Sequence, residues 1–244
     1  MLLHTSGISL RKTELSPDFQ QRLNVMIHQA ASSHGELDFQ FMNLYTVPVQ
    51  AFHSDGIKRI DLSYNKLKKA PALLTRSACN ILKLTMRYCD ISDLDSSICF
   101  LLKLQHLDLE GNCITKIPDE LMDLQDLLAL NLNKNRITKL PQNIGNLKSL
   151  TELNIDNNSL QKLDKSLEKC QCLETLSVEE NELENIDPFI FNISSLRRLC
   201  LSKNFIKTVP EAMGRLSLIQ LSLSSNEIDF LNNSCMCPNL CSTM

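Results

Sequence analysis

The cysteines are the first residues of this sequence that could do chemistry. There are ten in 244 residues, and two short groups bring thiols close together in the manner of a zinc site, Cys170-x-Cys172 and Cys235-x-Cys237-x3-Cys241. Neither group has the paired C-x2-C spacing of a structural zinc site, and the five histidines are scattered along the chain. The sequence therefore predicts no metal site.

Catalytic motifs are also missing. The chain contains no GxxxxGK[ST], GxGxxG, GxSxG or HExxH, the patterns of phosphate loops, dinucleotide-binding turns, nucleophilic serines and zinc proteases. Its candidate carboxylates are spread over several strands, with no histidine or lysine nucleophile beside them, and so do not define a general acid and base. We therefore predict that the protein is not an enzyme and needs no cofactor.

The last four residues, Cys-Ser-Thr-Met beginning at Cys241, have the bare form C-a-a-X of a prenylation signal. The two middle positions are polar and no polybasic stretch is nearby, although acylation of Cys235 and Cys237 would supply a second membrane signal. A lipid-anchored membrane adaptor is therefore an alternative prediction. Capture of the same S/T-x-Φ ending by a peptide-binding partner is another.

Composition and charge narrow the function classes. The net charge is −3, and phosphate binding needs a concentrated basic face, so nucleic acid is not expected as a ligand. The first residues do not resemble a signal peptide, and no stretch of about 20 apolar residues occurs, so we expect a cytoplasmic protein with reduced thiols. Hydrophobic residues make up 43% of the chain but aromatic ones only 5%, with no tryptophan, which predicts an aliphatic core.

An internal repeat dominates the sequence. The pattern LxxLxLxxNxL, with other aliphatic residues allowed at the apolar places, occurs eight times at spacings of 22 to 24 residues. A degenerate unit, HGELDFQFMNLYTVP from His34, precedes them and carries Met42 where asparagine would stand. The ninth position of the eight complete units falls at Asn65, Cys89, Asn112, Asn135, Asn158, Asn181, Asn204 and Asn226.

Each position of the repeat has a physical interpretation. The L-x-L alternation predicts a short strand with one buried face, and the asparagine turns the chain away from the sheet while its amide bonds the backbone of neighbouring turns. At Cys89 a weak S–H donor can take part of that role. In the second half, proline is expected at the first helical position of a short turn, as at Pro118, and aspartate is expected to cap the same turn in three units, Asp95, Asp164 and Asp187.

The repeat predicts the domain organisation. A unit that exposes an apolar face must stack on its neighbours, which gives an α/β solenoid with a parallel sheet on its concave side over residues 34–234. We predict an N-terminal segment, residues 1–33, with a helix over 16–34 that starts at Ser16 and stops at Gly35 and covers the first unit. A partner-binding role for this helix is the alternative. Residues 235–244 form a cysteine-containing tail.

The residues also resemble a known family. ITKLPQNIGNLKSL at 137–150 is similar to the unit ending LPxxIGxL of cytoplasmic leucine-rich repeat proteins of the 23-residue, Ras-suppressor-like and scribble-like class, and the resemblance covers roughly residues 34–231. It implies a non-enzymatic scaffold that binds a small GTPase, a phosphatase or another signalling protein on its concave face. We expect the protein to be a monomer, and to contact membranes only if it is lipidated.

The variable strand positions, which project from the concave face, are the candidate partner-binding residues. Phe41, Tyr64 and Tyr88 occupy the eighth position of the repeat in the first three units. They would form one contiguous aromatic strip, since neighbouring strands lie about 4.8 Å apart. Aromatic residues with arginine are typical of interface hot spots. Cover for the N-terminal flank of the solenoid is the alternative role for the rings. The basic residues expected beside this strip are Arg59, Lys83 and Arg87.

Further along, the same face is predicted to be acidic. Such a patch would favour a partner with basic residues at the centre of its interface. The attraction between the charges would act mainly on the association rate and on the orientation of the two proteins. The alternative is that these side chains only keep the sheet surface solvated. The six acidic residues are Asp108, Glu110, Glu152, Asp156, Glu179 and Glu180.

Overall fold

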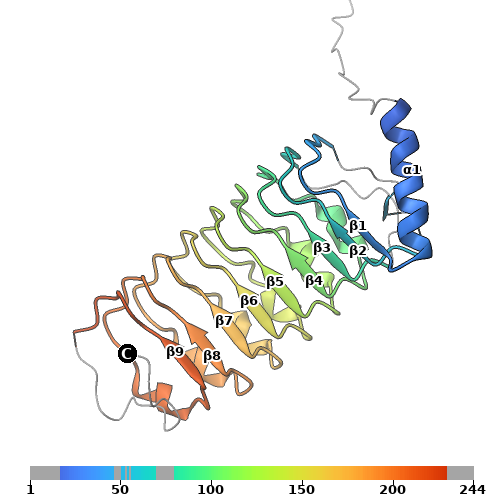
Figure 1. Cartoon of the computed structure of the whole chain (residues 1–244). Helices are drawn as coiled ribbons and strands as arrows, with labels where there is room; N and C mark the ends of the chain where they lie inside the picture. Colours follow the sequence, from blue (N-terminus) through green and yellow to red (C-terminus); the bar gives the residue numbers. More distant parts are fainter. Residues whose placement is uncertain (1–16, 47–50, 53, 55, 70–79, 230–244) are drawn as a thin grey trace, which may run out of the picture.

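A computed structural model of the chain describes residues 17–46, 51–52, 54, 56–69 and 80–229. Within these ranges, nine three-residue strands form one parallel sheet in which each strand pairs with the next one along the chain (Figure 1). The predicted α/β solenoid is therefore confirmed. The strands are β1 (Glu36–Asp38), β2 (Arg59–Asp61), β3 (Lys83–Thr85), β4 (His106–Asp108), β5 (Ala129–Asn131), β6 (Glu152–Asn154), β7 (Thr175–Ser177), β8 (Arg198–Cys200) and β9 (Gln220–Ser222).

The core is a stack of aliphatic residues that recur once per unit. The central residue of each strand from β1 to β8, such as Ile60 or Leu107, is buried, because alternate residues of a strand point to opposite faces. Register pairs these residues across neighbouring strands, as with Leu84 and Leu107, so each unit covers the apolar face of the one before it. The residues on either side of the central one face the concave surface.

The asparagine ladder fixes the bend after each strand. In Asn112, Oδ1 accepts the backbone N–H groups of Cys89 and Ile91, each at 3.0 Å, and Nδ2 donates to the carbonyls of Met86 and Leu109, each at 2.8 Å. Cys89 occupies the same ladder position, and its Sγ donates to the Leu62 carbonyl at 3.1 Å, as predicted. One side chain thus satisfies backbone groups of two adjacent units.

Short 3₁₀ helices return the chain on the convex side. They cover Ser96–Phe100, Asp119–Asp123, Ile144–Asn146, Lys165–Lys169, Pro188–Asn192 and Glu211–Arg215.

The starts of these helices only partly follow the prediction. Asp95 and Asp164 do cap their helices, by accepting the N–H groups of Ser97 and Ser166. Asp187 makes no such bond, and Pro188 opens its helix instead. The expectation that Pro118 is the first helical residue is wrong: its ψ of 142° is extended, so it is the N-cap, since proline fixes only φ.

Helix α1 (Pro17–Ser32) lies beside β1 at one end of the solenoid (Figure 1). Leu23 and Ala30 are buried in the core, and Gly35, at φ 69°, donates its N–H to the Ala30 carbonyl where the helix ends. The predicted helix is confirmed, although it ends two residues earlier, and its expected cap Ser16 lies outside the described residues. No helix in the described part of the chain combines the length and apolar character needed to cross a membrane.

Candidate functional site

The aromatic stack, formed by Phe41, Tyr64 and Tyr88, lies just beyond the ends of β1, β2 and β3. The ring centroids of Phe41 and Tyr64 are 4.5 Å apart with an interplanar angle of 5°, and those of Tyr64 and Tyr88 are 5.3 Å apart at 9°. The predicted contiguous strip is therefore present. The three residues are 71%, 43% and 38% exposed, so the rings stack on one another at the surface and outside the aliphatic core.

The backbone at the stack is in the left-handed region. Phe41, Tyr64 and Tyr88 have φ values of 57°, 59° and 51°, and residues at the same repeat position in later units, such as Lys134 and Asn157, share this conformation. Left-handed geometry favours glycine and asparagine and costs about 1–3 kcal/mol for other residues. Aromatic residues at this position are therefore not explained by the local backbone conformation.

Gly111 ends the stack. It occupies the same repeat position in the next unit, at φ 71°, and a Cβ placed there would lie 2.4 Å from the Tyr88 ring. The ring of Tyr88 therefore occupies space that only glycine leaves open. Sequence reasoning missed this residue, although it is the one glycine at the eighth position of the repeat.

A polar cluster holds the far side of the Tyr88 ring. Lys134 Nζ donates to Glu110 Oε1 at 2.7 Å and to the Tyr88 hydroxyl at 3.0 Å, and it lies 5.8 Å from the Tyr88 ring centroid. Burial disfavours the charged form of Glu110, but its bonds to Lys134 and Tyr88 outweigh this and lower its pKa. The hydrogen bond from Lys134 to Glu110 likewise raises the pKa of Lys134. Tyr88 is thus the fixed member of the stack.

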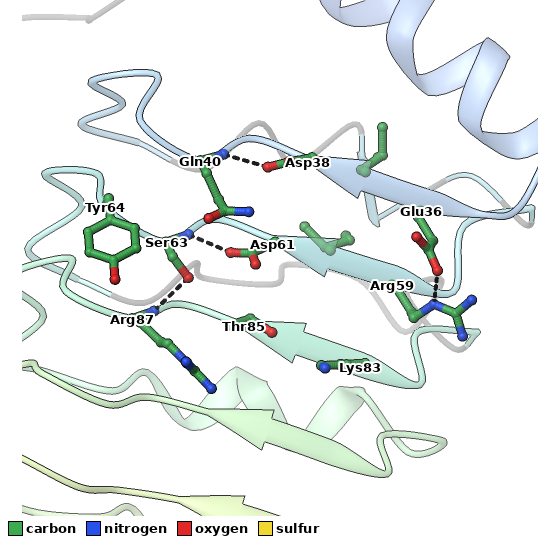
Figure 2. Close-up of a pocket in the computed structure, with 12 residues that line it drawn as sticks. Glu36, Asp38, Gln40, Arg59, Asp61, Ser63, Tyr64, Lys83, Thr85 and Arg87 are labelled. Atoms are coloured by element: carbon green, nitrogen blue, oxygen red, sulfur yellow. Dashed lines mark hydrogen bonds and ion pairs between the residues drawn. The ribbon is translucent and has the colours of Figure 1, made fainter.

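The predicted basic residues do not all lie beside the stack. Arg87 does, but its Nε donates to Asp108 at 2.8 Å, and this hydrogen bond raises its pKa. Arg59 and Lys83 are the first residues of β2 and β3, so they lie at the strand ends away from the stack (Figure 2). Arg59 forms an ion pair with Glu36. Placing these two beside the stack was therefore wrong, because five residues of extended chain span roughly 16 Å.

Three of the six residues in the predicted acidic patch form ion pairs with neighbouring cations. Asp108 pairs with Arg87, Glu110 with Lys134, and Glu180 with Lys203. These partners all lie in the turn that follows an adjacent strand, and the repeat pattern alone does not reveal them.

The other three carboxylates differ from one another. Burial raises the pKa of Asp156, whose Oδ1 accepts from the Ser177 hydroxyl and the Glu179 N–H, each at 2.7 Å. Glu152 accepts from Asn154 and is exposed. Glu179 is half-buried and makes no ion pair with any described residue. The six carboxylates lie on this face as predicted, but three of them are paired with cations, so the face is less acidic than expected.

A shallow bay of about 510 Å³ lies on the concave face over β1 to β3. Figure 2 shows Asp38 and Asp61 in its half nearer Tyr64, and Arg59 and Lys83 in the other half. The bay was not predicted. The sequence shows which residues face the concave side, but it does not show which of their side chains form ion pairs with one another.

Further exposed apolar side chains extend the surface around the stack. Met42 is 36% exposed and Tyr45 52%, and Lys66 Nζ lies 5.7 Å from the centroid of the Tyr45 ring. These residues belong to the bends after β1 and β2, next to Phe41 and Tyr64. The exposed apolar area at this end of the molecule is thus larger than the three rings alone.

The cysteines of the described residues are separate free thiols. Cys170 is buried and Cys172 exposed, and burial raises the pKa of Cys170 to about 11. No group of three or more His, Cys, Asp or Glu side chains that could hold a metal occurs among the residues the structure describes. Cys235, Cys237 and Cys241, including the candidate lipidation site, lie outside them.

Two family models match the chain. One, described as a leucine-rich repeat region, matches residues 60–176, and the other, described as a leucine rich repeat, matches residues 171–228. Together they span every complete unit except the start of the first.

Similar solved structures come from bacteria and plants. An internalin, InlF of Listeria monocytogenes, is 24% identical with a TM-score of 0.68, over 79% of this chain and 56% of that one. The functional domain of InlJ from the same species is 22% identical with a TM-score of 0.68, over 83% and 42%. The ectodomain of the Arabidopsis thaliana receptor kinase GASSHO1/SCHENGEN3, in complex with CASPARIAN STRIP INTEGRITY FACTOR 2, is 24% identical with a TM-score of 0.60, over 74% and 26%. This chain spans between about a quarter and just over half of these three proteins.

Proposed function

Because the chain is a leucine-rich repeat protein, we propose that it binds another protein on its concave face, with the aromatic stack as the anchor of the interface. Leucine-rich repeat domains commonly mediate protein–protein interaction and are typically non-enzymatic. The plant receptor ectodomain of this fold, bound to an integrity factor, is one example. The fold alone does not identify the partner, which must follow from the surface.

The observation that carries the proposal is the exposed stack of Phe41, Tyr64 and Tyr88. Large rings held rigidly at the surface bury much area on binding and lose little conformational freedom, which is why aromatic residues and arginine dominate interface hot spots. Arg87 lies beside the rings and is already fixed by Asp108. The arrangement is thus preorganised, which lowers the entropy cost of docking.

We propose that the partner is a signalling protein of the cytoplasm. The resemblance of the repeat to Ras-suppressor-like and scribble-like scaffolds favours a small GTPase, a phosphatase or another signalling protein, bound by a monomer. The six free thiols of the described residues are in keeping with a cytoplasmic protein, since thiols stay reduced there.

The test is affinity purification with quantitative mass spectrometry from cells that express the intact chain. The variant is Tyr64→Asn/Tyr88→Asn, since Asn157 shows that asparagine suits the same left-handed position. The control is Phe205→Ala, which removes a 48% exposed ring distant from the stack. We expect the stack variant, but not the control, to lose specific partners by about tenfold or more. Wild-type recovery of every partner by a folded stack variant would refute the proposal.

A further inference from the structure

We infer that the bay beside the aromatic stack receives an arginine side chain of the protein partner, next to an aromatic residue that packs on Phe41. The inference rests on the proposed function and specifies the chemistry of the partner. Two observations carry it, the unpaired carboxylates at one end of the bay and the open face of the stack.

The carboxylates belong to Asp38 and Asp61, which are register partners on β1 and β2. Each accepts the backbone N–H two residues further on, from Gln40 and Ser63 respectively, both at 2.9 Å, and this fixes its position with one oxygen. Neither makes an ion pair with any residue that the structure describes. Two carboxylates on adjacent strands, each with an oxygen still open, therefore face the bay.

The cations around the bay form no ion pair with these two carboxylates, and the attraction between Arg87 and Asp61 acts only at longer range. Arg59 is bonded to Glu36, and Arg87 is bonded to Asp108 and directed away from Asp61 (Figure 2). Lys83 lies at the other end of the bay, as the register partner of Arg59. The half of the bay nearest Tyr64 is therefore the acidic half, and the aromatic stack adjoins it.

A guanidinium group fits this half better than an ammonium group. It is planar and carries several N–H donors in a fixed fork, so it can bond carboxylate oxygens of adjacent strands at the same time. It can also lie against a tyrosine ring while it does so. An ammonium group is a compact and strongly hydrated charge and offers no such match.

The stack supplies the apolar part of the site. One face of the Phe41 ring lies against Tyr64, yet Phe41 is 71% exposed, so its other face is open. A further ring placed there would continue the parallel stack by one member, with a centroid spacing of about 4.5–7 Å. A partner segment that presents arginine next to an aromatic residue therefore matches both halves of the surface.

The probe is the peptide N-acetyl-Gly-Arg-Trp-Gly-amide, titrated into the ¹⁵N-labelled full chain and followed by NMR. We expect shifts at the amides of Gln40 and Ser63, whose N–H groups contact the two carboxylates, and in the ring signals of Phe41. Replacing the peptide arginine by glutamate should weaken binding by about tenfold or more.

The decisive variant is Asp38→Asn/Asp61→Asn. Asparagine keeps the oxygen that accepts the backbone N–H, so the turns survive while both charges are lost. The control Glu120→Gln/Asp123→Asn removes two exposed charges from a 3₁₀ helix on the convex side. We expect the first variant to lose about tenfold in peptide affinity and the control to stay within about twofold.

The inference is overturned if the glutamate peptide binds as well as the arginine peptide, or if the Asp38/Asp61 variant binds like the wild type. In partner purification, loss with the Tyr64/Tyr88 variant but not with the Asp38/Asp61 variant would reject the arginine and keep the proposed function. Loss with neither variant would reject both.

Discussion

The ring of Tyr88 lies so close to Gly111 that a Cβ atom added to Gly111 would come within 2.4 Å of it. The two residues hold the same repeat position in neighbouring units. The pair therefore sets the C-terminal limit of the aromatic stack, and its geometry decides how Tyr88 presents its ring to Tyr64.

Gly111→Ala should displace the Tyr88 ring and also strain the backbone. We expect a loss of about 1–3 kcal/mol in the free energy of unfolding, from the left-handed φ and the steric contact. In NMR spectra, the ring-current shifts of the Tyr64 and Tyr88 signals should shrink. Asn157→Ala is the control for backbone strain, because Asn157 has φ 55° at the same repeat position; it also removes the hydrogen bond between the Asn157 side chain and Glu180. Unchanged tyrosine ring shifts in Gly111→Ala would contradict this account.

Cys89→Asn should complete the asparagine ladder. Elsewhere, as at Leu44 and Ile114, an asparagine Oδ1 accepts the backbone N–H after the bend, whereas the corresponding Leu67 N–H has no acceptor among the described residues. Asparagine at residue 89 would supply one, so urea unfolding should show a gain of about 1 kcal/mol.

The reverse change provides the matched comparison for the ladder. Asn112→Cys removes the acceptor of two backbone N–H groups and should cost about 1–3 kcal/mol in the same urea experiment. A loss of stability in both variants would show that cysteine at residue 89 is better suited to its site than the ladder pattern predicts.

Alkaline pH should destabilise the fold through its buried thiols. Burial raises the pKa of Cys89 and of Cys170 from about 9 to about 11. Between these values the folded state holds protons that the unfolded state has released, so the stabilising effect is complete below about pH 9 and is lost as the pH rises to 11.

Urea unfolding under reducing conditions at pH 7.5, 9 and 10.5 measures this effect. Stability should change little between pH 7.5 and 9 and fall between pH 9 and 10.5, and the fall should be smaller in Cys170→Ala, which removes one of the buried thiols. Cys172→Ala is the control, because Cys172 is exposed. An equal pH dependence in all three proteins would assign the effect to other groups.

The repeat made the architecture predictable from the sequence. Eight copies in register define which residues are buried, where each strand lies and which residues share a column, and the contiguous stack of Phe41, Tyr64 and Tyr88 follows from that. Cys89 in the ladder was predictable for the same reason, since its role is set by its position in the unit.

The electrostatics of the concave face were not predictable in the same way. The position within the repeat shows that Asp108 and Arg87 share a face. It does not show which partner a long side chain reaches in the neighbouring unit, because that depends on its rotamer and length. Ion pairs neutralise three carboxylates of the expected acidic patch, whereas Asp38 and Asp61 form no ion pair with any described residue. Gly111 is recognisable in the sequence as the one glycine at the eighth position of the repeat. The reason for a glycine there is the nearby Tyr88 ring, which only the structure shows.

The stacked tyrosines also have an optical consequence. The chain contains three tyrosines and no tryptophan, so its ultraviolet emission comes from Tyr45, Tyr64 and Tyr88. Two of these lie 5.3 Å apart with nearly parallel rings. Any molecule that covers the stack would change the intrinsic fluorescence directly, and a tryptophan in that molecule would accept energy from both rings. The unlabelled protein is thus its own sensor of occupancy at this surface.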